Sequence, residues 1–154
     1  MDVTNLIKEA INNTAKLLNN DRITTAEDMI PHMRTIMKEE EYPAYYKEDI
    51  SYGLNKDAKF DIYYPDNIKG PYPVFVEVHG GAWFFGQKSS VEFKPFLHGL
   101  KRGYACVSAG YTLAPDAVYP TQVMEIKELI IYLKEHADEL NIDKDRIILW
   151  GGSA

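Results

Sequence analysis

The chain has 154 residues, of which 45% are hydrophobic and 26% charged, a composition typical of one folded globular domain. Its formal net charge of −6 offers no basic stretch to neutralise phosphates, which argues against a nucleic-acid partner and against an anionic membrane surface. The single cysteine, Cys106, excludes an intramolecular disulfide and a cysteine-based metal site, and its apolar surroundings predict a buried side chain.

The first 45 residues predict a helical segment. Apolar residues such as Leu6 and Ala10 recur at helical spacing, and Thr24 with Glu27 forms a capping box that marks a further helix start. The chain opens with no basic stretch followed by an apolar run, and no window approaches the roughly 18 apolar residues of a membrane span. We therefore expect a cytoplasmic protein.

Strand-like patterns follow this segment. Two short strands are predicted at residues 48–53 and 59–65, and "GLNKDA" between them is a plausible hairpin turn. The second strand has the two-residue period of a half-exposed strand, with one alternating set at Phe60, Ile62 and Tyr64 and the other at Lys59, Asp61 and Tyr63.

From residue 74 onward, apolar strands alternate with amphipathic helices. Strands are predicted at 74–79, 104–111 and 146–150, helices around 89–101 and after Pro120, and an exit loop at 141–145. This order predicts an α/β fold with a mostly parallel sheet and helices on its faces. In such sheets the functional residues follow the carboxyl ends of the strands.

Glu77 is a charged residue inside the apolar strand 74–79. An unpaired charge would be costly there, so a sheet face open to solvent or a salt bridge is the expected explanation. A role as catalytic acid is not expected, because the side chain precedes the following loop by too much.

The first loop that can carry chemistry is "HGGAWFFGQKS", which follows strand 74–79. It is not a phosphate-binding P-loop, because Gln87 separates the last glycine from the lysine. Gly80 and Gly81 allow backbone N–H groups to face an open space, where they can hold a developing negative oxygen. A tight turn without any ligand is the alternative, and the loop alone leaves both open. Likewise, the aromatic run 83–85 is either the lining of an acyl pocket or part of the core.

The second loop is "GGSA", at residues 151–154. It fits the first four positions of G-x-S-x-G directly after a strand, a motif in which the serine occupies a sharp, strained turn with its Oγ exposed. Glycine and serine are ordinary turn residues, so the motif is weak alone. The glycine loop that ends a neighbouring strand of the same predicted sheet strengthens it.

Three segments, "VHGGAW", "YTLAP" and "RIILWGGSA", in this order resemble the α/β-hydrolase esterases, in particular the hormone-sensitive-lipase-like and feruloyl/acetyl-esterase-like carboxylesterases. The resemblance implies an α/β-hydrolase domain whose N-terminal part is residues 46–154, with residues 1–45 as a helical, cap-like segment. It also implies hydrolysis of a small-molecule ester, short-chain or acylated-carbohydrate, through an acyl-enzyme, with no metal or cofactor.

Carried over by position, the resemblance makes Ser153 the nucleophile. The N–H groups expected to hold the oxyanion belong to Gly81, Ala82 and Ala154, and the residues expected to shape the loop are His79 and Gly80. The chain departs from the family in "YTLAPD", where Thr112 replaces an arginine and Asp116 replaces a longer acid. Neither change affects the nucleophile.

The family order places the catalytic acid and histidine after the nucleophile, and one residue follows Ser153 here. None of the four histidines (His32, His79, His98 and His136) is expected to act as the base. We therefore expect that the C-terminal part of the fold is missing and that this chain alone is inactive. Three explanations remain open: part of a longer esterase, a truncated product, or a short protein that binds a partner or a second copy through the unpaired edge of strand 146–150.

Overall fold

The computed structural model describes residues 45–66 and 68–154, together with Asn12 and Pro43. The chain divides into two units, residues 1–40 and 41–154, and the second contains the sheet. The helical segment expected at residues 1–45, with its capping box and His32, lies outside the described residues apart from Asn12, Pro43 and Tyr45.

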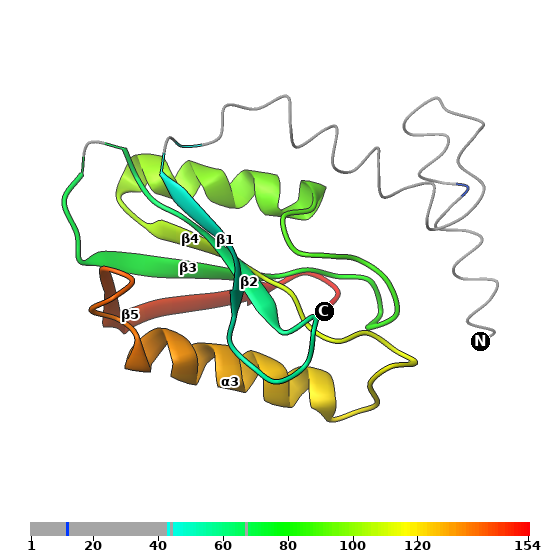
Figure 1. Ribbon diagram of the computed structural model, residues 1–154. Coiled ribbons are helices and arrows are strands. Elements are labelled where there is room, and N and C mark those ends of the chain that lie inside the picture. Colours follow the sequence, from blue (N-terminus) through cyan, green and yellow to red (C-terminus); the bar gives the residue numbers. More distant parts are fainter. Residues whose placement is uncertain (1–11, 13–42, 44, 67) are drawn as a thin grey trace. The chain divides into compact units, whose positions relative to one another are not determined.

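A mixed five-stranded sheet, in the order β1-β2-β4-β3-β5, organises the second unit (Figure 1). The strands are β1 (Tyr46–Ser51), β2 (Lys59–Tyr63), β3 (Tyr72–Val78), β4 (Ala105–Ala109) and β5 (Ile142–Gly151). The helices are η1, a 3-10 helix (Val91–Arg102), and α3 (Thr121–Glu135). β1 and β2 form the predicted antiparallel hairpin and β2 is also antiparallel to β4, whereas β3 is parallel to both β4 and β5.

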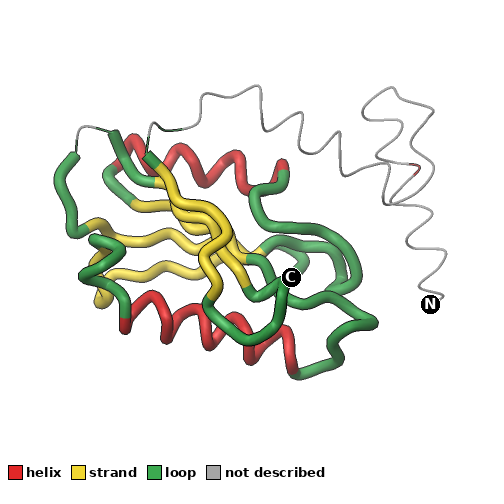
Figure 2. Tube along the Cα trace, viewed as in Figure 1, coloured by secondary structure: helices red, strands yellow, loops and turns green. Residues whose placement is uncertain are grey.

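The helices cover opposite faces of the sheet, as predicted (Figures 1 and 2). η1 contacts β3 and β4, and α3 contacts β5. The main apolar core lies between the sheet and α3, where Phe60, Ile62, Val76, Leu129 and Leu133 are fully buried. Removing this apolar surface from water is the principal stabilisation of the unit.

The interpretation of β2 as a half-exposed strand is wrong. Phe60 and Ile62 face the apolar core as their alternation predicts, but Asp61 and Tyr63 on the opposite face are also buried. The second face is covered because the Tyr63 ring packs against Phe93 of η1, and because Lys88 and Ser89 form hydrogen bonds to the Asp61 carboxylate. Asp61 tolerates burial because it is hydrogen-bonded there.

The exit loop expected at residues 141–145 falls largely within β5. Ile142 pairs with Tyr72 and Ile147 pairs with Val74, so the residues between them form an irregularity in the ladder. Asp143 stabilises this bulged segment by accepting hydrogen bonds from the backbone N–H of Asp145 and from Nε of Arg146.

β5 lies at one edge of the described sheet, as the sequence predicts. Ile148, Leu149 and Trp150 are each about half exposed along it. Within the part of the chain that the structure describes, no helix has both the length and the apolar character that crossing a bilayer requires.

Candidate functional site

Strand register brings the two candidate loops to the same end of the sheet. β3 and β5 are parallel neighbours, and Val78 pairs with Gly151 at their carboxyl ends. His79 and Gly152 therefore leave the sheet side by side, although they are more than seventy positions apart in the sequence. Figure 1 shows the C-terminus at the end of the sheet from which the loop after β3 emerges.

The segment after β5 turns sharply out of the sheet. The chain bends at Gly152, and Ser153 has a φ of 56°, in the left-handed region that a serine rarely adopts. A Cβ atom on Gly151 would lie 3.1 Å from the Ala154 Cβ and 3.5 Å from the Val78 carbonyl oxygen, so glycine suits this close approach. Ser153 is exposed, and its strained backbone presents the side chain at the rim of the sheet.

The loop after β3 has its own run of left-handed residues, with φ values of 127° at Gly81, 53° at Ala82 and 60° at Trp83. The Gly81 carbonyl accepts hydrogen bonds from the N–H groups of Phe84 and Phe85 at 2.9 and 3.1 Å. A Cβ on Gly81 would lie 1.8 Å from the Phe85 carbonyl oxygen, so only glycine fits. Among the described residues, none accepts a hydrogen bond from the N–H groups of Gly81 or Ala82.

His79 lies beneath this loop and is almost completely buried. Its ring stacks on Tyr111, with centroids 4.3 Å apart, and its Nδ1 is 2.8 Å from the Gly80 carbonyl oxygen that accepts its proton. The Tyr111 hydroxyl donates to the His79 carbonyl at 2.9 Å, which ties the start of the loop to the segment after β4. The observed contacts of His79 thus support the loop's shape.

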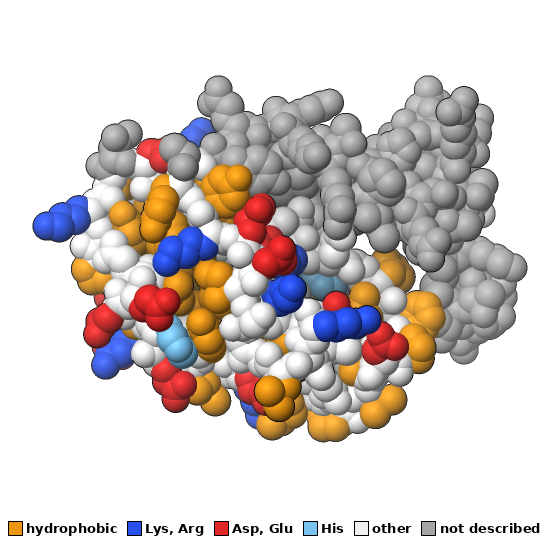
Figure 3. Space-filling model, in the orientation of Figure 1, with side chains coloured by type: hydrophobic (Ala, Val, Ile, Leu, Met, Phe, Trp, Pro, Cys, Tyr) orange, Lys and Arg blue, Asp and Glu red, His pale blue; other side chains and the backbone are white. Residues whose placement is uncertain are grey.

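The aromatic run after Ala82 divides between core and solvent. Trp83 packs against the apolar core and stacks on Tyr119 at 5.9 Å, whereas Phe84 is 47% exposed. Hydrophobic side chains gather at the lower right of Figure 3, over the segment that leads into α3, where Val118 and Tyr119 are largely exposed. Apolar surface therefore borders the loop.

Two other histidines lie elsewhere in the described unit. His98 is an exposed residue of η1. His136 follows the C-terminal end of α3, where it stacks on Tyr132 and its Nδ1 is 3.0 Å from the Tyr132 carbonyl oxygen. Since α3 runs antiparallel to β5 (Figure 1), its last turn lies at the end of the sheet opposite Ser153.

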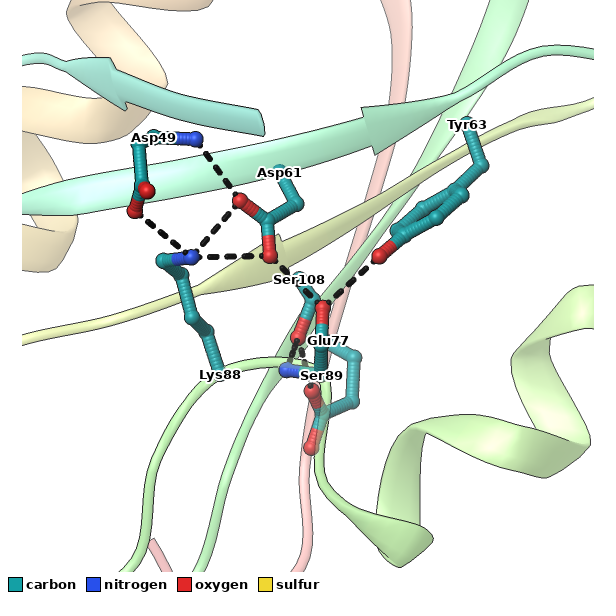
Figure 4. Close-up of polar contacts among 7 residues, drawn as sticks. All are labelled: Asp49, Asp61, Tyr63, Glu77, Lys88, Ser89 and Ser108. Atoms are coloured by element: carbon teal, nitrogen blue, oxygen red, sulfur yellow. Dashed lines mark hydrogen bonds and ion pairs between the residues drawn. The ribbon is translucent and has the colours of Figure 1, made fainter. Parts of the chain in front are cut away.

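A polar cluster with a buried centre, which the sequence analysis missed, lies next to the glycine loop (Figure 4). Its buried members are Asp61, Tyr63, Glu77 and Ser108, and its outer members are Lys88, Ser89 and the exposed Asp49. Strand register places its strand residues together, because Ser108 pairs with both Asp61 and Glu77 across neighbouring strands. The expectation that Glu77 faces solvent is wrong, because Glu77 is 2% exposed, and it accepts a hydrogen bond from the Ser108 hydroxyl at 3.1 Å.

A third buried carboxylate supports the segment after β4. Glu125 of α3 accepts hydrogen bonds from the backbone N–H and the hydroxyl of Thr112, at 2.7 and 2.8 Å, and from the Asn55 amide. Thr112 stands where the family motif has arginine, and here it binds Glu125 directly. Burial, assisted by the nearby charge of Glu125, raises the pKa of the Tyr52 hydroxyl, which donates to the Gly110 carbonyl.

Comparison with known proteins places these features in context. The family model BD-FAE matches residues 60–154. The "Probable carboxylic ester hydrolase LipM" of Mycobacterium tuberculosis is 33% identical over 109 residues, which cover 69% of this chain and 25% of LipM. The solved structure "Bacterial Heroin Esterase" is similar with a TM-score of 0.66 and 27% identity, covering 85% of this chain and 42% of that one.

A second solved structure, "Truncated form of carbohydrate esterase from gut microbiota", has a TM-score of 0.63 and 27% identity. The similarity covers 72% of this chain and 42% of that structure's chain. The chain thus spans a quarter of LipM and less than half of either solved structure.

Proposed function

Because this chain belongs to the BD-FAE family, we propose that it supplies the nucleophile and the oxyanion-binding loop of a carboxylic ester hydrolase. The similar solved structures confirm the predicted α/β-hydrolase fold. The observation that carries the proposal is the strained backbone of Ser153 directly after β5, beside the glycine loop that follows β3.

In the proposed reaction, Ser153 Oγ attacks the ester carbonyl and the carbonyl oxygen becomes negatively charged. The N–H groups of Gly81, Ala82 and Ala154 donate hydrogen bonds to this oxygen in the transition state. Expulsion of the alcohol leaves an acyl-Ser153 intermediate, which water then hydrolyses. The general base that removes the Ser153 proton and its acid partner are the residues that the family order places after the nucleophile.

The substrate we propose is a short-chain or acylated-carbohydrate ester. LipM is named as a carboxylic ester hydrolase, and one similar structure is named as a carbohydrate esterase. Ser153 and Ala82 are both exposed, which suits an ester carried on a bulky polar alcohol. The apolar surface at Trp83 and Tyr119 would contact the acyl group.

The test is hydrolysis of p-nitrophenyl acetate by the intact gene product and by its Ser153→Ala variant. Loss of the nucleophile should lower kcat by about 10⁴-fold or more without unfolding the protein. Ser51→Ala is a matched control, because Ser51 is an exposed serine of β1, and it should retain full activity. Activity that survives in Ser153→Ala would overturn the proposal.

A second candidate function is binding through the open edge of β5. The observation that favours it is the half-exposed apolar run Ile148, Leu149 and Trp150 on a strand that has one neighbour among the described residues. Such an edge can pair with a second chain. Sedimentation analysis should then show a dimer that Leu149→Lys dissociates, and a monomer at all concentrations would exclude it.

A further inference from the structure

We infer that Asp61 is a positioning residue for the proposed reaction. Through Lys88 and Ser89, it anchors the distal end of the glycine loop and so fixes the N–H groups of Gly81 and Ala82. This inference rests on the proposed function, because those N–H groups are the proposed oxyanion donors. Figure 4 shows the contacts from which it is built.

Asp61 is 1% exposed, and each of its two carboxylate oxygens accepts two hydrogen bonds. Its Oδ1 accepts from Lys88 Nζ at 2.7 Å and from the Asp49 backbone N–H at 2.9 Å. Its Oδ2 accepts from Lys88 Nζ at 2.9 Å and from Ser89 Oγ at 2.7 Å. A buried carboxylate with four such bonds is held in one orientation, and its desolvation cost is offset only while the bonds remain.

Lys88 and Ser89 are the residues that this carboxylate fixes. Burial favours the neutral amine of Lys88, but its hydrogen bonds to Asp61 and Asp49 outweigh that effect and raise the pKa, so the ammonium is retained. Ser89 has a φ of 53°, which is strained for a serine. Three hydrogen bonds hold it there: Oγ to Asp61, Oγ to the Tyr63 hydroxyl at 2.9 Å, and N–H to Ser108 Oγ at 2.7 Å.

The loop connects these anchors to the oxyanion donors through direct contact between its two arms. A Cβ on Gly86 would lie 2.4 Å from the Gly80 carbonyl oxygen and 2.5 Å from His79 Nδ1. Gly86 is two residues before Lys88, and Gly80 directly precedes Gly81. A shift of Lys88 and Ser89 therefore moves Gly86 against the arm that carries the proposed donors, because a packed contact of this kind has no free space to absorb it.

The consequence for catalysis is selective. Donors that act on the developing oxyanion stabilise the transition state more than the bound ester, so their misplacement lowers kcat and leaves KM nearly unchanged. A merely structural role for Asp61 would instead lower the amount of folded enzyme, without altering kcat per folded molecule.

The experiment measures kcat, KM and amide hydrogen exchange in the intact gene product with Asp61→Asn, Lys88→Met and Lys88→Arg. Asp61→Asn and Lys88→Met should lower kcat by about 10- to 100-fold with KM within about twofold. They should also speed exchange at residues 80–86 relative to the sheet. Lys88→Arg retains two hydrogen bonds to the carboxylate and should keep kcat within about fivefold. Lys56→Met, which breaks the exposed ion pair with Asp116, is the matched control and should change nothing.

The outcomes separate this inference from the proposed function. Ser153→Ala tests the function alone, and the exchange of residues 80–86 tests the anchoring without any activity. If folded Asp61→Asn or Lys88→Met keeps the parent kcat and the parent exchange rates, the inference is overturned. If Asp61→Asn fails to fold, Lys88→Met decides in the same way, because the Lys88 side chain is 22% exposed and its removal leaves Asp61 bonded to Ser89 and Asp49.

Discussion

The loop after β3 and the segment after β5 reach the same end of the sheet, but they are held in different ways. The first is fixed by buried side chains at both ends, His79 with Tyr111 at its start and Lys88 with Asp61 at its finish. Residues 151–154 are all exposed, and their geometry comes from strand register and one strained residue, Ser153. This difference suits the proposed roles, because oxyanion binding requires preorganised donors and a nucleophile requires exposure.

Apart from removal of the proposed nucleophile, the largest expected effect comes from exchanging glycine for alanine in each segment. Gly81→Ala places a methyl group 1.8 Å from the Phe85 carbonyl oxygen, whereas a Cβ on Gly152 meets no atom within 4 Å. Gly81→Ala should therefore lower kcat by about 100- to 1,000-fold, the usual cost of losing an oxyanion donor. Gly152→Ala should retain kcat within a few-fold. Equal losses in the two variants would contradict the difference between the segments.

Tyr111→Phe tests the anchor at the start of the glycine loop. The variant removes the hydrogen bond from the Tyr111 hydroxyl to the buried His79 carbonyl, and the loss of one such bond costs about 1 kcal/mol of unfolding free energy. Tyr119→Phe is the control, because Tyr119 is 70% exposed, and it should change stability by less than about 0.5 kcal/mol. Urea denaturation measures both. The anchor would be unimportant if the two variants were equally stable.

For residues 151–154, the strained backbone at Ser153 predicts that one substitution stabilises the protein. Glycine adopts a φ of 56° at little cost, whereas alanine retains the strain of serine. Ser153→Gly should therefore be more stable than Ser153→Ala by about 1 kcal/mol, while both lack the proposed nucleophile. Thermal denaturation of the two variants checks this. If Ser153→Gly is no more stable than Ser153→Ala, the backbone at Ser153 is unstrained.

A prediction of pH dependence concerns Cys106, which donates through Sγ to the Phe96 carbonyl of η1, the helix that follows the glycine loop. Burial raises the pKa of this thiol from 9.0 to about 12. The folded state therefore favours the neutral thiol, so its contribution to stability is complete below pH 9 and is lost as the pH rises toward 12. The difference in unfolding free energy between the parent and Cys106→Ala should shrink over that range. A difference independent of pH would contradict the burial of the thiol.

The sequence was sufficient for the features that depend on local pattern. Apolar runs located β3, β4 and β5, and the glycine and serine positions indicated the two loops at the carboxyl end of the sheet. The buried charge of Asp61 was missed, because alternation along a strand identifies its two faces but not what covers each of them. Its partners Lys88 and Ser89 are 27 and 28 positions away, so only the folded chain brings them together.

The bulge in β5 was missed for a related reason. The composition of Asp143 and its neighbours is typical of a turn, so the sequence predicts a loop there. Ile142 belongs to the strand because it pairs with Tyr72 of β3, which the local sequence does not reveal. Similarly, the buried Glu77 of β3 accepts a hydrogen bond from Ser108 of β4, which is 31 positions away. In each case a contact between distant segments overrides the local preference.

The most direct test of the proposed site is a crystal structure of the intact gene product after reaction with a phosphonate ester. We expect phosphorus bonded to Ser153 Oγ, with one phosphoryl oxygen accepting hydrogen bonds from the N–H groups of Gly81 and Ala82. Phosphorus on any other residue, or a phosphoryl oxygen that points away from the glycine loop, would contradict it.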